Sequence, residues 1–446
     1  MFFRREAVSL SVFNRHRMRQ FLLCLGLLII SFQQIQAQWS ASGSSKGQPF
    51  AYEPTAVSGM DVVYVYDDMA GAVLEYATDQ PSAWTWSRFE RSEAEAQAVD
   101  PAYVQSTATA TRLLNVQAGY AYRIQSGSIS RFVYIVSYQP TEVTSIQSIE
   151  PETCTERFLQ IQSTSPELLY YGRNGLAYPL QRIFSLQWTD LEWNEDLRMF
   201  EEVQRTKTSQ SILSPWLVDA PLCSTHYALK GDDLSAYYDQ EILFQSSLFP
   251  ATSVQMKATA KMVTRDALNE LDRPTELELS GSAPLKVQLQ SYSSPAAQLI
   301  EWWIRPAQGN EGSSYRFTDE SLTYTFQKSG SFEIVGYAHS TGCIDSVRFQ
   351  VTVLESFLDC PNFFTPRSTP GDNDEFRVAY RSIVSFHGVI LNRWGNKLFE
   401  WTDPAQGWDG NFQGKPVSPG VYFYIIKATG SEGKAYTKRG DINLLE

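Results

Sequence analysis

Short runs of alternating apolar and polar residues follow one another along most of the chain. Between Asp61 and Tyr138, clusters of Gly, Asp, Pro and Ser separate these runs at the spacing typical of β-sandwich strands. The pattern predicts one β domain within residues 38–143, built from the runs DVVYVYDD, AVLEYAT, SAWTWSRF, ATRLLNVQ, GYAYRIQ and RFVYIVSY. Residues 92–99 (SEAEAQAV) are the one short helical candidate.

The strand pattern continues through residues 144–268, where a second β-sandwich is predicted. Its clearest local signal is Asn174-Gly175, which lies between apolar runs in LLYYGRNGLAYPL. Asn-Gly is the strongest short cue for a β-hairpin, because both residues tolerate a positive φ. Asp232-Asp233 is expected to form a turn.

The segment VQAGYAYRI at residues 116–124 resembles the tyrosine corner of immunoglobulin-like folds, in which a Tyr hydroxyl caps the turn before a central strand. An ordinary aromatic strand explains the same residues equally well, so both interpretations stay open. Trp84 and Trp86 alternate on a strand, and we expect them to serve core packing rather than sugar binding.

The composition favours the same fold class. Of 446 residues, 43% are hydrophobic, 13% aromatic and 19% charged, which is typical of a globular protein and not of a disordered one. Aromatic and β-branched side chains suit a pleated, half-buried surface. We therefore predict an all-β protein of tandem immunoglobulin-like β-sandwich domains, and the length suits about three or four of them.

The N-terminus has the pattern of an export signal. Arginines precede an apolar run at residues 21–32, and Ala37 offers a cleavage point before Gln38. The run is too short to span a bilayer, which requires about 20 apolar residues. We predict a signal peptide at residues 1–37, starting at Met1 or Met18, and an exported protein with no transmembrane span of its own.

The chain that follows this signal is strongly acidic. Residues 1–37 hold five Arg and one Glu, so excluding them changes the formal net charge from −12 to −16. Nucleic acid is not expected as a partner, because it requires a basic face.

Four cysteines follow the signal: Cys154, Cys223, Cys343 and Cys360. An even number in an exported protein suggests disulfides, with three possible connectivities. Cys154–Cys223 is the favoured pair, because both residues lie in the second predicted domain. Cys343–Cys360 is less secure, because the intervening run SVRFQVTVL reads as a strand that would carry its ends roughly 30 Å apart.

Residues 269–356 resemble the PKD-like immunoglobulin module of bacterial surface proteins. The matching features are Trp303 on a central strand, Tyr324-Thr325-Phe326 followed by Ser329-Gly330-Ser331-Phe332, and a closing strand from Asp345 to Val353. Arg305-Pro306-Ala307 replaces the Asp-rich turn of that family, so metal binding is not transferred.

Residues 357–446 carry the longest series of motifs. In order they contain Asn392-Arg393-Trp394-Gly395, Gly407-Trp408-Asp409-Gly410, and Pro419-Gly420-Val421-Tyr422 with Tyr424. The segment resembles the type B C-terminal sorting domain of the Bacteroidota, also called the gliding-motility-associated C-terminal domain. Independently of any family, its glycines predict the tight turns of a small antiparallel β-sandwich.

This resemblance implies export by the type IX secretion system and a place at the cell surface, associated with the outer membrane. It also implies two kinds of partner, an outer-membrane β-barrel of the PorP/SprF type and components of the secretion system. Docking by β-addition, through a strand edge or an aromatic patch, is a hypothesis. The sorting-motif residues are Arg393, Trp394, Gly395, Gly407, Trp408, Asp409, Gly410, Gly420, Tyr422 and Tyr424.

The sequence contains no nucleophile elbow, zinc-protease helix, Cys-x-x-Cys pair or phosphate loop, so neither catalysis nor a cofactor is expected. The acidic loop of Asp372, Asp374 and Glu375 has oxygen ligands for Ca²⁺, but a solvated turn is the favoured interpretation. The three histidines that follow the signal lack a second His at ligand spacing: His226, His339 and His387.

We therefore expect a non-catalytic surface protein, and two roles stay open. One is a structural or accessory component of the secretion or gliding apparatus. The other is an adhesin or glycan-binding protein that uses type IX secretion only for export. The modest length favours the first role, since adhesins of this class tend to carry long repeat arrays.

Overall fold

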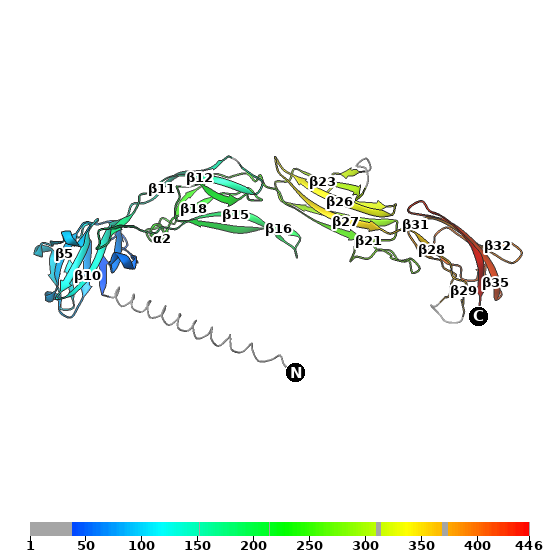
Figure 1. Cartoon of the computed structure of the whole chain (residues 1–446), viewed down its shortest axis with the longest axis horizontal. Coiled ribbons are helices and arrows are strands. Elements are labelled where there is room, and N and C mark those ends of the chain that lie inside the picture. Colours follow the sequence, from blue (N-terminus) through cyan, green and yellow to red (C-terminus); the bar gives the residue numbers. More distant parts are fainter. Residues whose placement is uncertain (1–37, 151, 214, 309–313, 368–372, 446) are drawn as a thin grey trace, which may run out of the picture.

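The computed structural model describes residues 38–150, 152–213, 215–308, 314–367 and 373–445. Figure 1 shows them as four β-sheet modules that follow one another along an elongated molecule. The prediction of an all-β protein made of tandem sandwiches is confirmed. The predicted signal peptide at residues 1–37 lies outside the described residues. Within the described part of the chain, no helix is long and apolar enough to cross a membrane.

The first module is a sandwich of two sheets. The smaller sheet has the order β1 (Trp39–Ser42), β4 (Val73–Ala77), β8 (Ala110–Leu113) and β7 (Val104–Ser106). The larger sheet has the order β2 (Phe50–Tyr52), β3 (Val62–Tyr66), β10 (Ile129–Ser137), β9 (Ala121–Ser126), β5 (Thr85–Phe89) and β6 (Gln97–Ala98). Its loops hold the 3-10 turns η1 (Ala56–Ser58), η2 (Pro81–Ala83), η3 (Glu93–Glu95) and η4 (Pro101–Tyr103). The helical candidate at residues 92–99 therefore contains a single 3-10 turn.

The tyrosine corner is present in this module. Tyr122 is 1% exposed, and its hydroxyl accepts a hydrogen bond from the Gln117 N–H at 2.8 Å. Trp86 is buried, and its Nε1 donates to Thr111 Oγ1 at 2.9 Å. The half-buried ring of Trp84 lies 5.1 Å from that of Tyr76. Both tryptophans thus pack within the module, as expected.

The second module also has two sheets. One contains β11 (Glu142–Ile149), β12 (Glu156–Thr164) and β17 (Trp216–Asp219). The other contains β16 (Met199–Ser209), β15 (Phe184–Asn194), β18 (Ala228–Lys230) and β19 (Ile242–Gln245). Asn174-Gly175 forms the predicted hairpin, between β13 (Leu169–Tyr171) and β14 (Ala177–Pro179), with Gly175 at a φ of +82°. The prediction of a turn at Asp232-Asp233 is wrong. Asp232 caps the helix α2 (Asp233–Tyr237), and its carboxylate accepts a hydrogen bond from the Ser235 N–H at 2.9 Å.

The hairpin β13–β14 and helix α2 join the first two modules. Leu168, Tyr170, Leu180 and Leu234 pack on the face of the larger first-module sheet that points away from the smaller one. That sheet is therefore buried on both faces, which explains why the strand β3 is continuously apolar.

The third module begins earlier than predicted. Its sheets are β20 (Met256–Met262), β22 (Leu285–Ser293) and β25 (Ser321–Phe326), and β21 (Ser280–Gly281), β27 (Ile344–Val353), β26 (Gly330–His339), β23 (Leu299–Pro306) and β24 (Tyr315–Phe317). Strand β20 pairs with β22 along its whole length, and Met256 and Met262 lie in the core. The boundary placed between residues 268 and 269 is therefore wrong.

Trp302, and not Trp303, is the core tryptophan of the third module. It is 0% exposed, and its Nε1 donates to the Asp319 carbonyl at 3.1 Å. Because side chains alternate along a strand, Trp303 points to the outer face of β23.

The fourth module is built on a five-stranded sheet. Its order is β29 (Phe363–Phe364), β36 (Ala435–Leu444), β35 (Gly420–Gly430), β31 (Ile383–Leu391) and β32 (Lys397–Trp401). The short pair of β28 (Phe357–Asp359) with β30 (Ala379–Arg381) packs on one face, and a second short pair is formed by β33 (Asn411–Phe412) and β34 (Lys415–Pro416).

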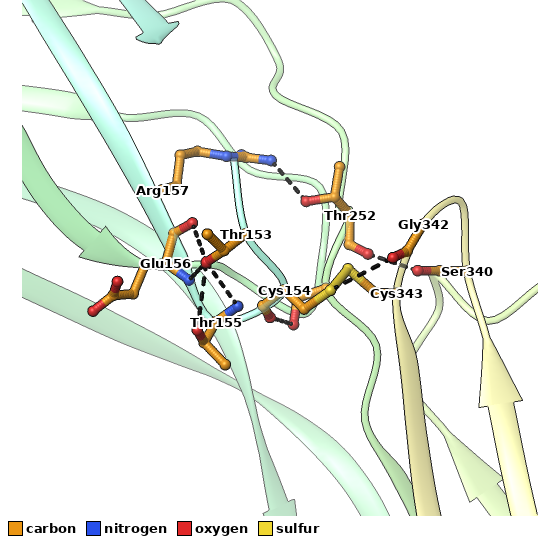
Figure 2. The surroundings of a disulfide bond; sticks show 10 residues. Thr153, Cys154, Thr155, Glu156, Arg157, Thr252, Ser340, Gly342 and Cys343 are labelled. Atoms are coloured by element: carbon orange, nitrogen blue, oxygen red, sulfur yellow. Dashed lines mark hydrogen bonds between the residues drawn. A yellow bond between two sulfur atoms is a disulfide. The ribbon is translucent and has the colours of Figure 1, made fainter. Parts of the chain in front are cut away.

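A disulfide crosses the junction between the second and third modules (Figure 2). It joins Cys154, just before β12, to Cys343, in the turn between β26 and β27. The predicted pairs Cys154–Cys223 and Cys343–Cys360 are wrong, since Cys223 and Cys360 are free thiols. Cys154 lies at the end of its module that faces the third module, so its nearest cysteine is remote in sequence.

Two hydrogen bonds flank this disulfide. Ser340 Oγ donates to the Thr252 carbonyl, and Ser253 Oγ donates to the Cys154 carbonyl, each at 2.7 Å. The ring of Trp193, near the end of β15, also lies 5.3 Å from that of Tyr292 on β22. Covalent, polar and aromatic contacts thus fix the same junction.

Candidate docking face of the C-terminal module

The turn between β31 and β32 presents the most exposed part of the sorting motif. The Asn392 side-chain oxygen accepts the N–H groups of Trp394 at 3.0 Å and Asn396 at 2.9 Å. Gly395 completes the turn with a φ of +83°, which favours glycine. Trp394 is 71% exposed, and the Arg393 guanidinium lies over its ring at 4.2 Å. The turn therefore holds a large ring in solvent at a defined position.

A second loop faces this turn across a hollow of about 540 Å³. The hollow is lined on one side by residues of the Trp394 turn and on the other by residues 417–423. Tyr422 fixes the second loop, because its hydroxyl donates to the Ser418 carbonyl at 2.7 Å. Gly420 starts β35 at a φ of +149°.

An apolar stripe runs from this hollow along the outer face of the five-stranded sheet. In the register of β31 and β35, Leu391 lies opposite Phe423 and Val389 lies opposite Ile425. Val421 and Phe423 are 49% and 42% exposed. We call the set the outer stripe, and it consists of Val389, Leu391, Val421, Phe423 and Ile425. None of these five side chains belongs to a core cluster of the described residues.

Charged side chains border the outer stripe on both sides. On β32, Glu400 pairs with Lys397 and with His387 Nε2 at 2.8 Å. Hydrogen bonds from Lys397 and then His387 lower the pKa of the Glu400 carboxyl, because they favour its ionised form. On β36, Arg439 and Asp441 lie opposite Ile425 and Phe423. An apolar centre with a charged rim is the usual anatomy of a protein-binding surface.

The other sorting-motif residues build the module instead of its surface. Trp408 is 0% exposed, and its Nε1 donates to the Asn411 carbonyl at 2.8 Å. Its ring lies 5.2 Å from Tyr422 and 5.5 Å from Phe364. Asp409 accepts the Asn411 N–H at 3.0 Å, beside Gly410 at a φ of +78°.

Two more motif positions also serve packing. The ring of Tyr424 lies 5.4 Å from that of Phe376, tilted by 35°, and a Cβ on Gly407 would meet the side chains of Arg377 and Glu375. The structure therefore divides the motif. Arg393, Trp394 and Gly395 form the exposed turn, while the remaining residues shape the core and the second loop.

The sheet has two edges: β29 covers β36 only at Asn443 and Leu444, and the opposite edge, β32, is poorly suited to β-addition. Strand β32 is the edge strand next to β31, and it spans five residues that include Lys397 and Glu400. Short, charged edges discourage pairing with another strand. β32 is therefore a poor site for β-addition, and the exposed aromatic and apolar face is the candidate docking surface described here.

The sequence contains a signal for the outer stripe that lies outside the sorting motif. The runs GVIL and VYFYII place apolar residues at consecutive positions of β31 and β35. A strand with one solvated face alternates, whereas a strand that is apolar on both sides has both faces covered. The consecutive pattern therefore indicates a second contact surface.

The histidines and the acidic loop that the sequence singled out lie apart from one another in the described part of the chain. His226 Nδ1 faces the Ser246 carbonyl at 2.9 Å, and His339 Nε2 faces Glu301 at 3.2 Å. Asp372 lies outside the described residues. Among the residues that the structure describes, no three His, Cys, Asp or Glu side chains are placed to share a metal ion.

Cys360 is expected to be an unreactive thiol. Burial raises its pKa to about 11, because the apolar surroundings disfavour the thiolate. An ordinary thiol has a pKa of about 8.5, so at pH 8 the Cys360 thiolate is roughly two hundredfold scarcer. A thiolate of higher pKa is also the stronger nucleophile, which offsets part of this scarcity. In a Cys223→Ser background, alkylation by iodoacetamide should therefore be at least roughly tenfold slower in the folded protein than in urea. A native rate within fivefold of the rate in urea would contradict the prediction.

Family comparisons agree with two of the four modules. Residues 358–444 match the family described as CHU_C type IX secretion signal domain. Residues 146–246 match the family described as fibronectin type III domain. The C-terminal segment is thus a type IX secretion signal domain, as its motifs predicted, and it follows an immunoglobulin-like or fibronectin-like array. Both are non-catalytic kinds of domain. No curated protein matches the chain.

Comparison with solved structures gives matches of low identity and low TM-score. The tetra-tandem repeat in the extending region of a large adhesion protein is 10% identical and covers 85% of this chain and 96% of its own, with a TM-score of 0.22. The Sidekick-1 immunoglobulin domains 1–5 are 11% identical and cover 81% of this chain and 73% of their own, with a TM-score of 0.25. The chicken CNTN1 FN1–FN3 domains are 9% identical and cover 63% of this chain and 94% of their own, with a TM-score of 0.19. No function is transferred from these likenesses.

Proposed function

We propose that the protein is a non-catalytic surface rod that the type IX secretion system exports and that its C-terminal module holds at the outer membrane. The observation that carries the proposal is the exposed Trp394 turn beside the outer stripe, on the module that matches the secretion signal domain. The partner is an outer-membrane β-barrel of the PorP/SprF type, and the rod is a structural or accessory component of the secretion or gliding apparatus.

The junctions support the role of a rod. An apolar hairpin and helix brace the first two modules, and a disulfide joins the second and third. An array with fixed junctions transmits position and force along its length, which a string of flexibly linked domains does not.

Trp394→Ala is expected to detach the protein from the cell surface without unfolding it. Exposed tryptophans at binding surfaces are common hot spots, and losing one costs about 2 kcal/mol or more of binding free energy. We expect the outer-membrane fraction of the exported protein, measured by immunoblot against the culture medium, to fall at least roughly tenfold.

Trp303→Ala is the matched control, because Trp303 also points outward but lies on the third module. It should leave surface retention unchanged. Equal retention of Trp394→Ala and the unmodified protein would remove the Trp394 turn from the docking surface.

Gene deletion tests the wider role. If the rod is part of the apparatus, cells that lack it should export other type IX substrates poorly. Isolation of the intact protein from outer membranes should at the same time recover a bound β-barrel. Normal export of other substrates by the deletion strain would favour the adhesin alternative.

One feature favours the role of an adhesin or glycan-binding protein as the second candidate. A hollow of about 480 Å³ on the outer face of β23 and β26 is lined by Trp303, Tyr337, Glu301 and His339, among others. The Glu301 carboxylate accepts a hydrogen bond from Arg316 at 2.5 Å. Aromatic rings beside fixed polar groups are the usual lining of a small-ligand site.

A further inference from the structure

The peptide between the third and fourth modules is unusually well protected. Only Leu354, Glu355 and Ser356 separate β27 from β28. All three carbonyls accept hydrogen bonds, from Ser382 Oγ at 2.5 Å, Arg381 Nε at 2.8 Å and the Tyr436 hydroxyl at 2.9 Å. The Leu354 N–H donates to Gly281 at 2.9 Å, and the Ser356 N–H donates to Glu432 at 3.1 Å. This linker is therefore built into the structure of both modules.

A strap from the third module strengthens the same junction. The strap is the segment 263–284, between β20 and β22. It lies along β30, where the Leu271 N–H donates to the Tyr380 carbonyl at 2.7 Å and the Tyr380 N–H donates to Asn269 at 3.2 Å. The Asn269 amide also donates to the carbonyls of Val378 and Pro404, each at 2.7 Å.

Buried polar groups hold the strap in place. The Glu270 side chain is 0% exposed and pairs with Arg265, which also donates to the Ser282 carbonyl at 3.0 Å. Ser382 connects strap and linker, because its Oγ accepts the Ala283 N–H at 2.9 Å while its N–H donates to Ser282 Oγ at 2.7 Å. Ser382 is 0% exposed. Breaking this network would leave several buried groups without partners, at a substantial cost.

We infer that the C-terminal module stays covalently attached after export, because the linker cannot enter the active site of a processing protease. A protease binds its substrate as an extended strand and therefore needs an exposed segment that can leave the fold. Here the linker would have to give up its bonds to β30, the strap and the hairpin of β35 and β36. The module is then a permanent part of the rod, and no mature form lacking it is released.

Limited proteolysis of the purified full chain tests this inference directly. With a protease of broad specificity such as subtilisin, mapped by mass spectrometry, the first cuts should fall in exposed loops outside the strap, for example beside Leu197 between β15 and β16, which is 60% exposed. No early cut should fall between residues 353 and 359. An early cut in that interval would overturn the inference.

Ser382→Ala is expected to expose the linker. It removes the hydroxyl that binds both Leu354 and Ala283, so cleavage between residues 353 and 359 should accelerate roughly tenfold. Ser385→Ala is the matched control, because Ser385 is exposed on β31 of the same module. Melting curves by circular dichroism should show that the digestion temperature lies well below the melting temperature of both variants. If Ser382→Ala is cut at the same sites and rates as Ser385→Ala, the network does not protect the linker.

The inference rests on the proposed export, so a cellular measurement completes the test. Peptides of the fourth module should be as abundant as peptides of the first module in protein extracted from the surface of type IX-secreting cells. Depletion of fourth-module peptides would overturn the inference. Failure to reach the surface would instead contradict the proposed function, while the proteolysis result would still decide the inference.

Discussion

Replacing Trp408 with alanine is expected to unfold the C-terminal module. The ring is fully buried between Phe364 and Tyr422, and its Nε1 satisfies the Asn411 carbonyl. Truncation of a buried tryptophan to alanine costs about 3–5 kcal/mol. Because a domain of this size has a total stability of about 5–15 kcal/mol, the loss is a large share of it.

Trp394→Ala provides the control within the same module. The two tryptophans differ in exposure, 0% against 71%, so the second variant should change the free energy of unfolding by less than about 0.5 kcal/mol. Chemical denaturation followed by tryptophan fluorescence measures both. We expect Trp408→Ala to abolish surface display through unfolding, and Trp394→Ala to abolish retention while folded. If the C-terminal module of Trp408→Ala unfolds at the same denaturant concentration as that of the unmodified protein, Trp408 does not stabilise the core of the module.

Removing the disulfide is expected to turn the middle of the rod into a hinge. The double variant Cys154→Ser, Cys343→Ser deletes a cross-link between residues 189 positions apart. Cross-links of this kind contribute about 2–4 kcal/mol. The hydrogen bonds of Ser253 and Ser340 and the contact of Trp193 with Tyr292 would stay, but each contributes about 1 kcal/mol.

Small-angle X-ray scattering of the full chain measures this effect. Compared with the unmodified protein, the variant should show a broader distribution of interatomic distances. A smaller fraction of the molecules should be fully extended. Cys223→Ser, Cys360→Ser is the control, because it removes the two free thiols and leaves the cross-link. Identical scattering from the two double variants would show that the disulfide does not set the angle between the modules.

Local features of the fold were predictable from the sequence. The Asn174-Gly175 hairpin, the Tyr122 corner and the Gly395 turn each depend on a few adjacent residues with a restricted φ or a nearby hydrogen-bond partner. The all-β class followed from alternation and composition. These signals are short-range, so one sequence is enough to reveal them.

Features that depend on distant segments were not predictable. Strand β20 belongs to the third module because it pairs with β22, across the 22-residue strap at 263–284, whose one strand, β21, has two residues. The choice between Trp302 and Trp303 depends on which face of β23 meets β22 and β25. The partner of Cys154 lies in another module, because the ends of two sandwiches meet there.

The candidate docking face was half predictable. The motif residues led to the turn at Trp394, but they did not separate exposed positions from core positions such as Trp408. That separation requires knowing which face of the sheet is covered by β28, β30 and the segment that contains Trp408. The outer stripe lies on the face that these segments leave open.

The first module cannot complete its fold until the second has been made. Val63, Val65 and Tyr134 need the cover that Leu180 and Leu234 supply from the next module. A chain that stopped near residue 143 would leave these side chains in water, and such a face invites aggregation. During synthesis and translocation, the N-terminal half therefore matures as one folding unit, and a chaperone would have to shield it until α2 has emerged.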